Sequence, residues 1–342
     1  MNTEKKIVII AIALVAMIVI GEVAIYGMSD RYSSSADTDS GTLNYSITAR
    51  GSKEYSVIVM DNCLEPMGEL YIYYDPEYPI VAEDVSVAIG ASQLTVERYV
   101  QQLTTSLRIR GVSNINTINA AELGNAMVSD ASSTHSKGLV VLSGALPDTV
   151  YTGSAADPIF DWLNTGGRLY WAGNLIGNYS STAGGIVDIG DIGQGLFGVS
   201  CFSTADDDTA FQDVSTPYRD ALSLMNNRIR YAVDTSLLSA SEYVAAGYTD
   251  GTYSSIVSVK YGNGMVCVLG GSHSNMQRDD LAQVIASGLC YSSELVALEE
   301  GSVKRTTISS SVDISTATGN ISVYVYFGGY YTVHGRTYSF IA

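Results

Sequence analysis

Positive charge is scarce in this sequence. Its 342 residues include 18 Lys and Arg against 35 Asp and Glu, which gives a net charge of −17, and only 15% of the residues are charged. Because a basic surface is needed to bind phosphate backbones, this balance argues against a nucleic-acid partner. It predicts an acidic surface that opposes self-association. Hydrophobic residues still make up 46% of the chain, which is enough for a large core and excludes a disordered protein.

Several catalytic and cofactor motifs are also missing. The sequence has no Gly-x-Ser-x-Gly elbow and no P-loop, which argues against an ordinary α/β-hydrolase or NTPase. Its three histidines, His135, His273 and His334, lie far apart and form no metal-binding pair. Residues 193–198 match a dinucleotide-binding pattern, but no helix pattern follows whose N-terminus could hold a pyrophosphate. We therefore predict neither a cofactor nor a transition-metal site.

Acidic side chains leave two other chemistries open. Residues 206–208, and Asp188 together with Asp191, offer carboxylate oxygens of the kind that bind Ca²⁺. A solvated acidic loop explains the same pattern, and we predict no metal there. Paired carboxylates that hydrolyse a glycosidic bond also stay open, because sequence spacing does not give the distance between two side chains.

The longest apolar run lies at the N-terminus. Residues 7–28 follow Lys5 and Lys6, contain the single acidic residue Glu22, and are long enough for a helix to cross a bilayer. The run exceeds the apolar part of a cleaved signal peptide, so an uncleaved signal anchor is favoured over a removed one. The two lysines place the body outside the cell. Glu22 either reaches water at the interface or contacts a partner helix in an assembly.

Sequons and cysteines agree with an extracellular location. Asn44, Asn178 and Asn320 each begin an Asn-x-Ser acceptor site for N-glycosylation. The four cysteines are even in number and form no Cys-x-x-Cys motif, as expected in an oxidising compartment. A disulfide between Cys267 and Cys290 is favoured, because a strand and the helix that returns over it can bring them together. Buried free thiols are the alternative.

The pattern along the chain predicts four parts. These are a signal-anchor helix at 1–28, a polar linker at 29–42, an extracytoplasmic α/β domain at 43–295 and an antiparallel β-module at 296–342. Within the α/β domain, strands are predicted at 55–60, 70–74, 138–143, 168–172 and 265–269, and helices at 93–110, 158–165 and 276–291. Several of the strands are continuous apolar runs, which are typical of a parallel sheet covered on both faces. We therefore predict an α/β fold with three layers and a mainly parallel sheet.

The β-module is rich in tyrosine. Residues 321–327 alternate strictly, so if Val323 and Val325 face the core, Tyr324 and Tyr326 point outward. Exposed aromatic rings stack on sugars or on a neighbouring subunit, which makes these two residues a candidate assembly contact. Tyrosine as a good strand former on a half-exposed face is the simpler explanation.

Three stretches carry a resemblance to a known fold. Residues 138–144 read Gly-Leu-Val-Val-Leu-Ser-Gly, residues 159–174 read as a helix, a Gly-Gly turn and a strand, and residues 259–273 read as a hairpin into a late core strand. Together they resemble the class I glutamine amidotransferase-like fold, in the non-catalytic form found in membrane-attached surface proteins. The resemblance implies an amidotransferase-like or flavodoxin-like, Rossmann-like sheet over residues 55–292.

The same resemblance implies that the family's chemistry is lost. Catalytic members place a Cys nucleophile after the strand, whereas Asn174 stands nearest that position here, and an amide cannot act as a thiolate does. His273 falls where the family's His follows the late strand, but it has no nucleophile to activate. The resemblance therefore implies a pseudoenzyme whose fold is kept for another purpose.

These observations predict a non-catalytic, membrane-anchored extracellular protein that binds or assembles cell-envelope components. Its partner would be a protein or a glycan, and a homo-oligomer is left open. One alternative is an extracytoplasmic hydrolase that acts on glycan or peptide. Another is a filament or sheath subunit that assembles through the N-terminal helix.

Overall fold

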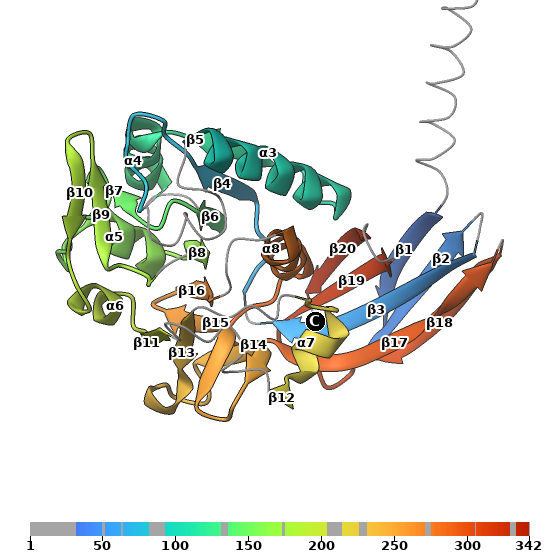
Figure 1. Cartoon of the computed structure of the whole chain (residues 1–342). Helices are drawn as coiled ribbons and strands as arrows, with labels where there is room; N and C mark the ends of the chain where they lie inside the picture. Colours follow the sequence, from blue (N-terminus) through green and yellow to red (C-terminus); the bar gives the residue numbers. More distant parts are fainter. Residues whose placement is uncertain are drawn as a thin grey trace, which may run out of the picture.

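The computed structural model describes residues 32–49, 52–62, 64–81, 93–130, 136–172, 175–203, 214–225, 231–270, 275–304, 306–328 and 333–341. The described part of the chain is mostly β, with 46% of the described residues in strands and 22% in helices. A mixed sheet with its helices forms one part of the molecule, and a β-sandwich forms the other (Figure 1).

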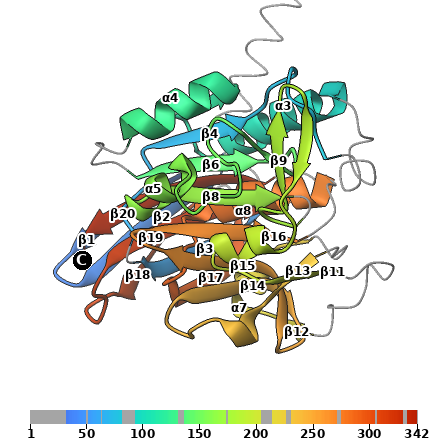
Figure 2. The same ribbon diagram turned by 90° about the vertical axis from the view of Figure 1, so that its left-hand side faces the viewer.

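The mixed sheet has ten strands, and half of it is parallel. The parallel strands lie in the order β5 (Ile115–Ile118), β4 (Glu69–Tyr73), β6 (Lys137–Val141), β8 (Arg168–Ala172) and β16 (Gly264–Leu269). Figure 2 shows β4, β6 and β8 side by side. The antiparallel half continues from β16 through β15 (Tyr253–Tyr261), β13 (Tyr231–Asp234) and β11 (Cys201–Ser203), with β14 (Tyr243–Thr249) and β12 (Val214–Ser215) beside β15.

Helices cover both faces of the parallel half. The helices α3 (Gln93–Ile109) and α8 (Asn275–Ser287) pack against each other and share a core with alternate strand residues such as Val140 and Tyr170. On the opposite face, α4 (Ala120–Asp130) and α5 (Pro158–Asn164) bury Leu139 and Trp171. Because both faces are buried, the strands β4, β6, β8 and β16 are apolar after their first residue, as the sequence indicates.

Shorter elements complete this part of the molecule. They are β7 (Leu146–Pro147), β9 (Tyr179–Thr182) and β10 (Gly185–Asp188), which form a small sheet, and the helices α6 (Ile192–Leu196), α7 (Pro217–Ala221) and η1 (Thr235–Leu237).

The β-sandwich joins the two ends of the described chain. One sheet contains β1 (Tyr32–Asp39), β2 (Thr42–Ala49) and β18 (Thr307–Asp313), and the other contains β17 (Glu294–Lys304), β3 (Ser52–Asn62), β19 (Asn320–Gly328) and β20 (His334–Ile341). Every pairing in both sheets is antiparallel. Leu43, Ile47, Val59 and Val323 are fully buried in the core of this sandwich.

The prediction of a three-layer, mainly parallel α/β fold is wrong for the chain as a whole. Residues 55–60 lie in β3 of the sandwich and not in a parallel sheet, and the predicted linker at 29–42 contributes β1. The predicted β-module at 296–342 exists only together with β1, β2 and β3.

The prediction of a single-pass membrane protein with an extracellular body has no support in the structure and is not kept. Residues 1–28 and Glu22 lie outside the described residues. Within the part of the chain that the structure describes, no helix has both the length and the apolar character needed to cross a membrane.

Candidate functional site

The predicted elbow lies outside the described residues. Asn174 and His273 follow in sequence the strands β8 and β16, which are parallel neighbours that end at the same edge, with Ala172 paired to Leu269. The structure therefore places the two strand ends together but does not describe the two predicted site residues.

The three sequons differ in accessibility. Asn44 is exposed on β2, and Asn320 is partly buried at the start of β19. Asn178 is only 6% exposed, donates from Nδ2 to Asp191 Oδ1 at 3.2 Å and accepts from Gln194 Nε2 at 3.0 Å. The amide nitrogen of Asn178 is therefore used inside the fold, and of the three predicted glycan sites only Asn44 is exposed.

Tyr324 and Tyr326 are not surface residues. They are 0% and 3% exposed, and they are buried in the same core as the helices α3 and α8. Val323 and Val325 face the sandwich core instead. Both faces of β19 are therefore buried, and the prediction that the two tyrosines offer an outward assembly contact is wrong.

The predicted disulfide is also wrong. Cys267 and Cys290 are both described, both are buried, and no disulfide joins them. Cys267 lies in the central strand β16, whereas the Cys290 thiol is directed to Asn62 Oδ1 of β3 at 3.6 Å. The alternative of buried thiols holds for this pair.

The burial of Cys267 leads to a testable expectation. Burial raises the pKa of its thiol to about 12, so the reactive thiolate is rare at pH 8. We expect iodoacetamide at pH 8 to leave Cys267 unmodified in the folded protein and to modify it in guanidinium chloride, as measured by peptide mass spectrometry. Rapid modification of Cys267 without denaturant would contradict the buried position.

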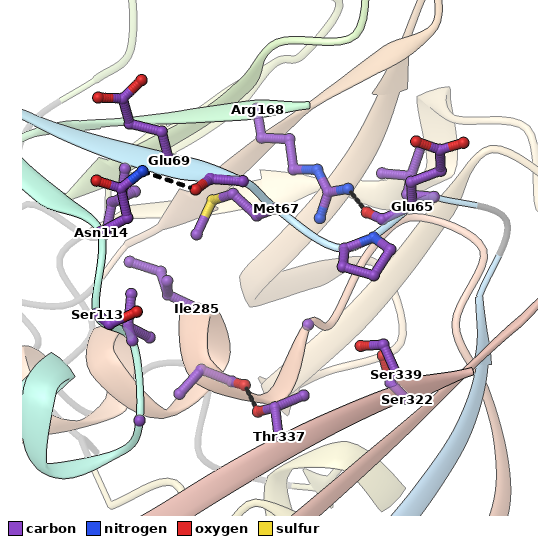
Figure 3. Close-up of a pocket in the computed structure, with 18 of the residues that line it drawn as sticks. Glu65, Met67, Glu69, Ser113, Asn114, Arg168, Ile285, Ser322, Thr337 and Ser339 are labelled. Atoms are coloured by element: carbon purple, nitrogen blue, oxygen red, sulfur yellow. Dashed lines mark hydrogen bonds between the residues drawn. The ribbon is translucent and has the colours of Figure 1, made fainter. Parts of the chain in front are cut away.

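A pocket of about 210 Å³ lies between the mixed sheet and the sandwich (Figure 3). Its walls are the loop before β4, the loop after α3, the end of α8, and the strands β19 and β20. Its polar lining residues are Glu65, Glu69, Ser113, Asn114, Arg168, Asn320, Ser322, Thr337 and Ser339. Glu69 begins β4 and Arg168 begins β8, so this pocket opens at the amino edge of the parallel strands, opposite to the predicted elbow.

The sandwich lines the pocket with side chains that share one face of β19 and β20. Ser322 of β19 pairs with Ser339 of β20, and Asn320 lies two residues before Ser322 on the same face. This is also the face of Tyr324, which packs against α8. On this face, the first residues of β19 therefore present hydroxyl and amide groups to the mixed sheet. The later residues Tyr324 and Tyr326 present aromatic rings.

Arg168 organises the opposite wall. Its side chain is only 3% exposed, Nε donates to Ser136 Oγ at 2.7 Å, and Nη2 donates to the backbone oxygen of Glu65. The bond to Glu65, drawn in Figure 3, ties the loop before β4 to the start of β8. A buried guanidinium with these bonds is a rigid part of the wall.

The two carboxylates of the pocket have different surroundings. Glu69 accepts hydrogen bonds from Tyr71 Oη at 3.0 Å and Asn116 Nδ2 at 2.6 Å, and its Oε2 lies 3.3 Å from Lys137 Nζ. Glu65 is exposed, and its carboxylate makes no hydrogen bond with the described residues. Figure 3 shows Glu65 and Glu69 on either side of Arg168. One acid is therefore fixed by three cationic or polar neighbours, while the other is unconstrained.

Sequence reasoning missed this pocket, although one signal was available. Glu69 and Arg168 are the charged first residues of strands that are otherwise apolar, where a charge is tolerated only if it reaches a partner or solvent. The remaining lining groups come from segments that are distant in sequence, and their approach depends on the docking of the sandwich.

Comparisons with known proteins identify no family. No family model and no curated protein matches the chain. Among solved structures, it is similar to an exo-β-1,4-mannosidase from Opitutaceae bacterium strain TAV5, with 10% identity, a TM-score of 0.37, and coverage of 64% of this chain and 33% of that one. A β-galactosidase from Rahnella sp. R3 has 13% identity and a TM-score of 0.36, with coverage of 81% of this chain and 41% of that one.

A cytoplasmic protein, STM1381 from Salmonella typhimurium LT2, has 12% identity and a TM-score of 0.36, with coverage of 64% of this chain and 98% of that one. The chain thus spans about a third to two fifths of the length of the two enzymes. Similarity at this level establishes no common fold and transfers no activity. The prediction of a non-catalytic pseudoenzyme depended on a mainly parallel, amidotransferase-like fold, which is wrong for the chain as a whole, and it is not kept.

Proposed function

We propose that this chain is a glycan hydrolase that holds one sugar unit in the pocket between the mixed sheet and the sandwich. The observation that carries the proposal is the pocket lining, in which Ser, Thr, Asn, Glu and Arg residues come together from both parts of the molecule. A sugar presents many hydroxyl groups, each able to donate and accept, and such a mixed set of partners satisfies them.

The size of the pocket supports a small ligand. At about 210 Å³ it falls below the roughly 300–1,000 Å³ of sites for drug-sized molecules. One terminal sugar unit suits this volume better than an extended chain does. Leu64, Met67 and Ile285 add apolar surface to the lining, which suits the carbon face of a sugar ring.

The two glutamates support hydrolysis as the reaction. Glycoside hydrolysis uses one carboxylic acid to protonate the leaving oxygen and one carboxylate as a base or nucleophile. Glu69, whose carboxylate is held in place by Tyr71, Asn116 and Lys137, is assigned the second role. Glu65, which is exposed on the loop before β4, is assigned the role of the acid.

The experiment is a screen with aryl glycosides that release a chromophore, using the wild-type chain and the variants Glu65→Gln and Glu69→Gln. We expect turnover of at least one glycoside and a decrease in kcat of at least about 100-fold in each variant. Glu77→Gln is the matched control, because Glu77 is exposed and does not line the pocket.

Calorimetry with the matching free sugar separates binding from chemistry. Binding that is retained in Glu65→Gln while turnover is lost would support the assigned role. Sugar binding without turnover in the wild-type chain would overturn the hydrolytic step, and absence of binding would overturn the site itself.

A further inference from the structure

Arg168 is a buried cation without a carboxylate partner. Its side chain is only 3% exposed, and a charge removed from water to this extent is normally balanced by an opposite charge. Arg168 forms no ion pair with any residue that the structure describes. Glu69 pairs with Lys137 at 3.3 Å instead, and Glu65 offers Arg168 its backbone oxygen and not its carboxylate. The described part of the chain therefore leaves the positive charge of Arg168 unbalanced.

One nitrogen of this guanidinium is available to the pocket. Nε and Nη2 donate to Ser136 and Glu65, whereas Nη1 donates to no residue among those that the structure describes. Nη1 is not enclosed by the protein either, and Arg168 is the only basic residue among the described residues that line the pocket. In Figure 3 its guanidinium group lies between Met67 and Glu65. A ligand held in the pocket can therefore reach Nη1.

A second polar group beside Arg168 lacks a partner. Tyr170 lies two residues further along β8, on the same face of the strand, and is 0% exposed. Its hydroxyl has no hydrogen-bond partner within the described chain. Burial raises the pKa of this hydroxyl, and the positive charge of Arg168 opposes the effect, which places the two groups close together. A Cβ on Gly138 would meet both the Tyr170 ring and the Met67 sulfur, so Tyr170 lies directly behind the pocket wall.

We propose that the sugar unit held in this pocket is an acidic sugar, whose carboxylate accepts a hydrogen bond from Arg168 Nη1 and balances its charge. This inference rests on the sugar-binding part of the proposed function and names its substrate class. A guanidinium prefers a carboxylate to a hydroxyl, because a hydrogen bond between two charged groups is roughly twice as strong as a neutral one. On the opposite wall, Ser322 and Ser339 suit the uncharged hydroxyl groups of the same ring.

The other charges of the pocket permit an acidic ligand. The carboxylate of Glu69 is balanced by Lys137, so it does not add a net negative charge to the site. Glu65 is assigned the role of the acid, and in that role it carries a proton and no charge. Arg168 is then the one group of the site whose charge a ligand must balance.

Calorimetric titration of the full chain with sodium glucuronate and with glucose tests the inference, because these sugars differ only in a carboxylate that replaces a hydroxymethyl group. We expect glucuronate to bind at least about tenfold more tightly than glucose. Sodium acetate at equal ionic strength should bind more weakly than glucuronate, since it lacks the ring.

The failure of this inference can be distinguished from the failure of the proposed function. Equal binding of the two sugars would overturn the acidic sugar and leave the sugar site in place, whereas absence of binding by either sugar would overturn both. Acetate that binds as tightly as glucuronate would indicate a site for free carboxylates and would also overturn the inference. Preferential binding of glucuronate without turnover of any glycoside would support the inference and count against hydrolysis alone.

Variants of Arg168 test whether this residue sets the preference, measured as the ratio of the two affinities. Arg168→Gln removes the charge and is expected to reduce the ratio to less than about twofold. Arg168→Lys keeps the charge but loses the planar fork, so it should lower the ratio without abolishing it, and it decides the matter if Arg168→Gln does not fold. Arg219→Gln, at an ion pair elsewhere on the molecule, should leave the ratio unchanged. A wild-type ratio in a folded variant of Arg168 would overturn the inference.

Discussion

Replacing Gly264 with alanine is expected to lower the free energy of unfolding by about 3 kcal/mol, near the upper end for overpacked sites. A Cβ at this position would lie 2.0 Å from the carbonyl oxygen of Gly167 and 2.6 Å from that of Leu163. Both are backbone atoms, so no side-chain rotation can relieve the contact. Met265 N–H donates to the same Gly167 oxygen at 3.0 Å, where the pairing of β16 with β8 begins. The alanine must therefore separate two central strands of the mixed sheet.

Urea unfolding followed by circular dichroism measures this loss, and Gly195→Ala is the matched control. Gly195 is exposed in α6, and a Cβ there would meet no atom within 4 Å. Alanine is the better helix former, so this variant should be neutral or more stable by up to about 1 kcal/mol. Equal stability of the Gly264 and Gly195 variants would show that the strands do not approach as closely as described.

Local signals in the sequence identify the elements of the parallel half well. The runs at 138–143, 168–172 and 265–269 correspond to β6, β8 and β16, because burial on both faces makes every side chain apolar. The helix predicted at 93–110 corresponds to α3, since its apolar residues recur at helical spacing and Gly111 adopts a φ of 91° after the last turn.

The same signals misplace β3, for a physical reason. Val57 and Val59 face the sandwich core, while Ile58 and Met60 face the helices under the mixed sheet. A strand between two buried layers is apolar throughout, whether its neighbours are parallel or antiparallel. The partners of β3 are β17 and β19, more than 230 residues away, and no local pattern indicates such a pairing.

The alternation in β19 misleads in a similar way. Val323 and Tyr324 differ in polarity, but a tyrosine ring can be buried when its hydroxyl finds a partner. Tyr324 Oη donates to Gln283 Oε1 at 2.9 Å, and Tyr326 Oη donates to the backbone oxygen of Ala221 at 2.9 Å. The candidate sites depend on this docking, which brings together groups of the sheet, the helices and the sandwich.

Replacing Gln283 with leucine is expected to lower the free energy of unfolding by about 3–5 kcal/mol, because this residue joins the helices to the sandwich. Gln283 is 3% exposed, and its Oε1 accepts from both Arg110 Nε and Tyr324 Oη at 2.9 Å. Its Nε2 donates to the backbone oxygen of Leu222 at 3.1 Å. Leucine fills a similar volume but leaves a buried cation, a buried hydroxyl and a buried carbonyl without this partner.

A second variant separates the loss of polar partners from a change in packing. Adding Tyr324→Phe to Gln283→Leu removes one of the unpaired groups, so the double variant should recover about 1 kcal/mol relative to Gln283→Leu alone. Gln101→Leu, at an exposed position of α3, should change stability by less than about 0.5 kcal/mol. Additive losses in the double variant would mean that the Tyr324 hydroxyl does not depend on Gln283. The join between the helices and the sandwich would then rest on apolar packing, and the polar network would not specify how the two parts dock.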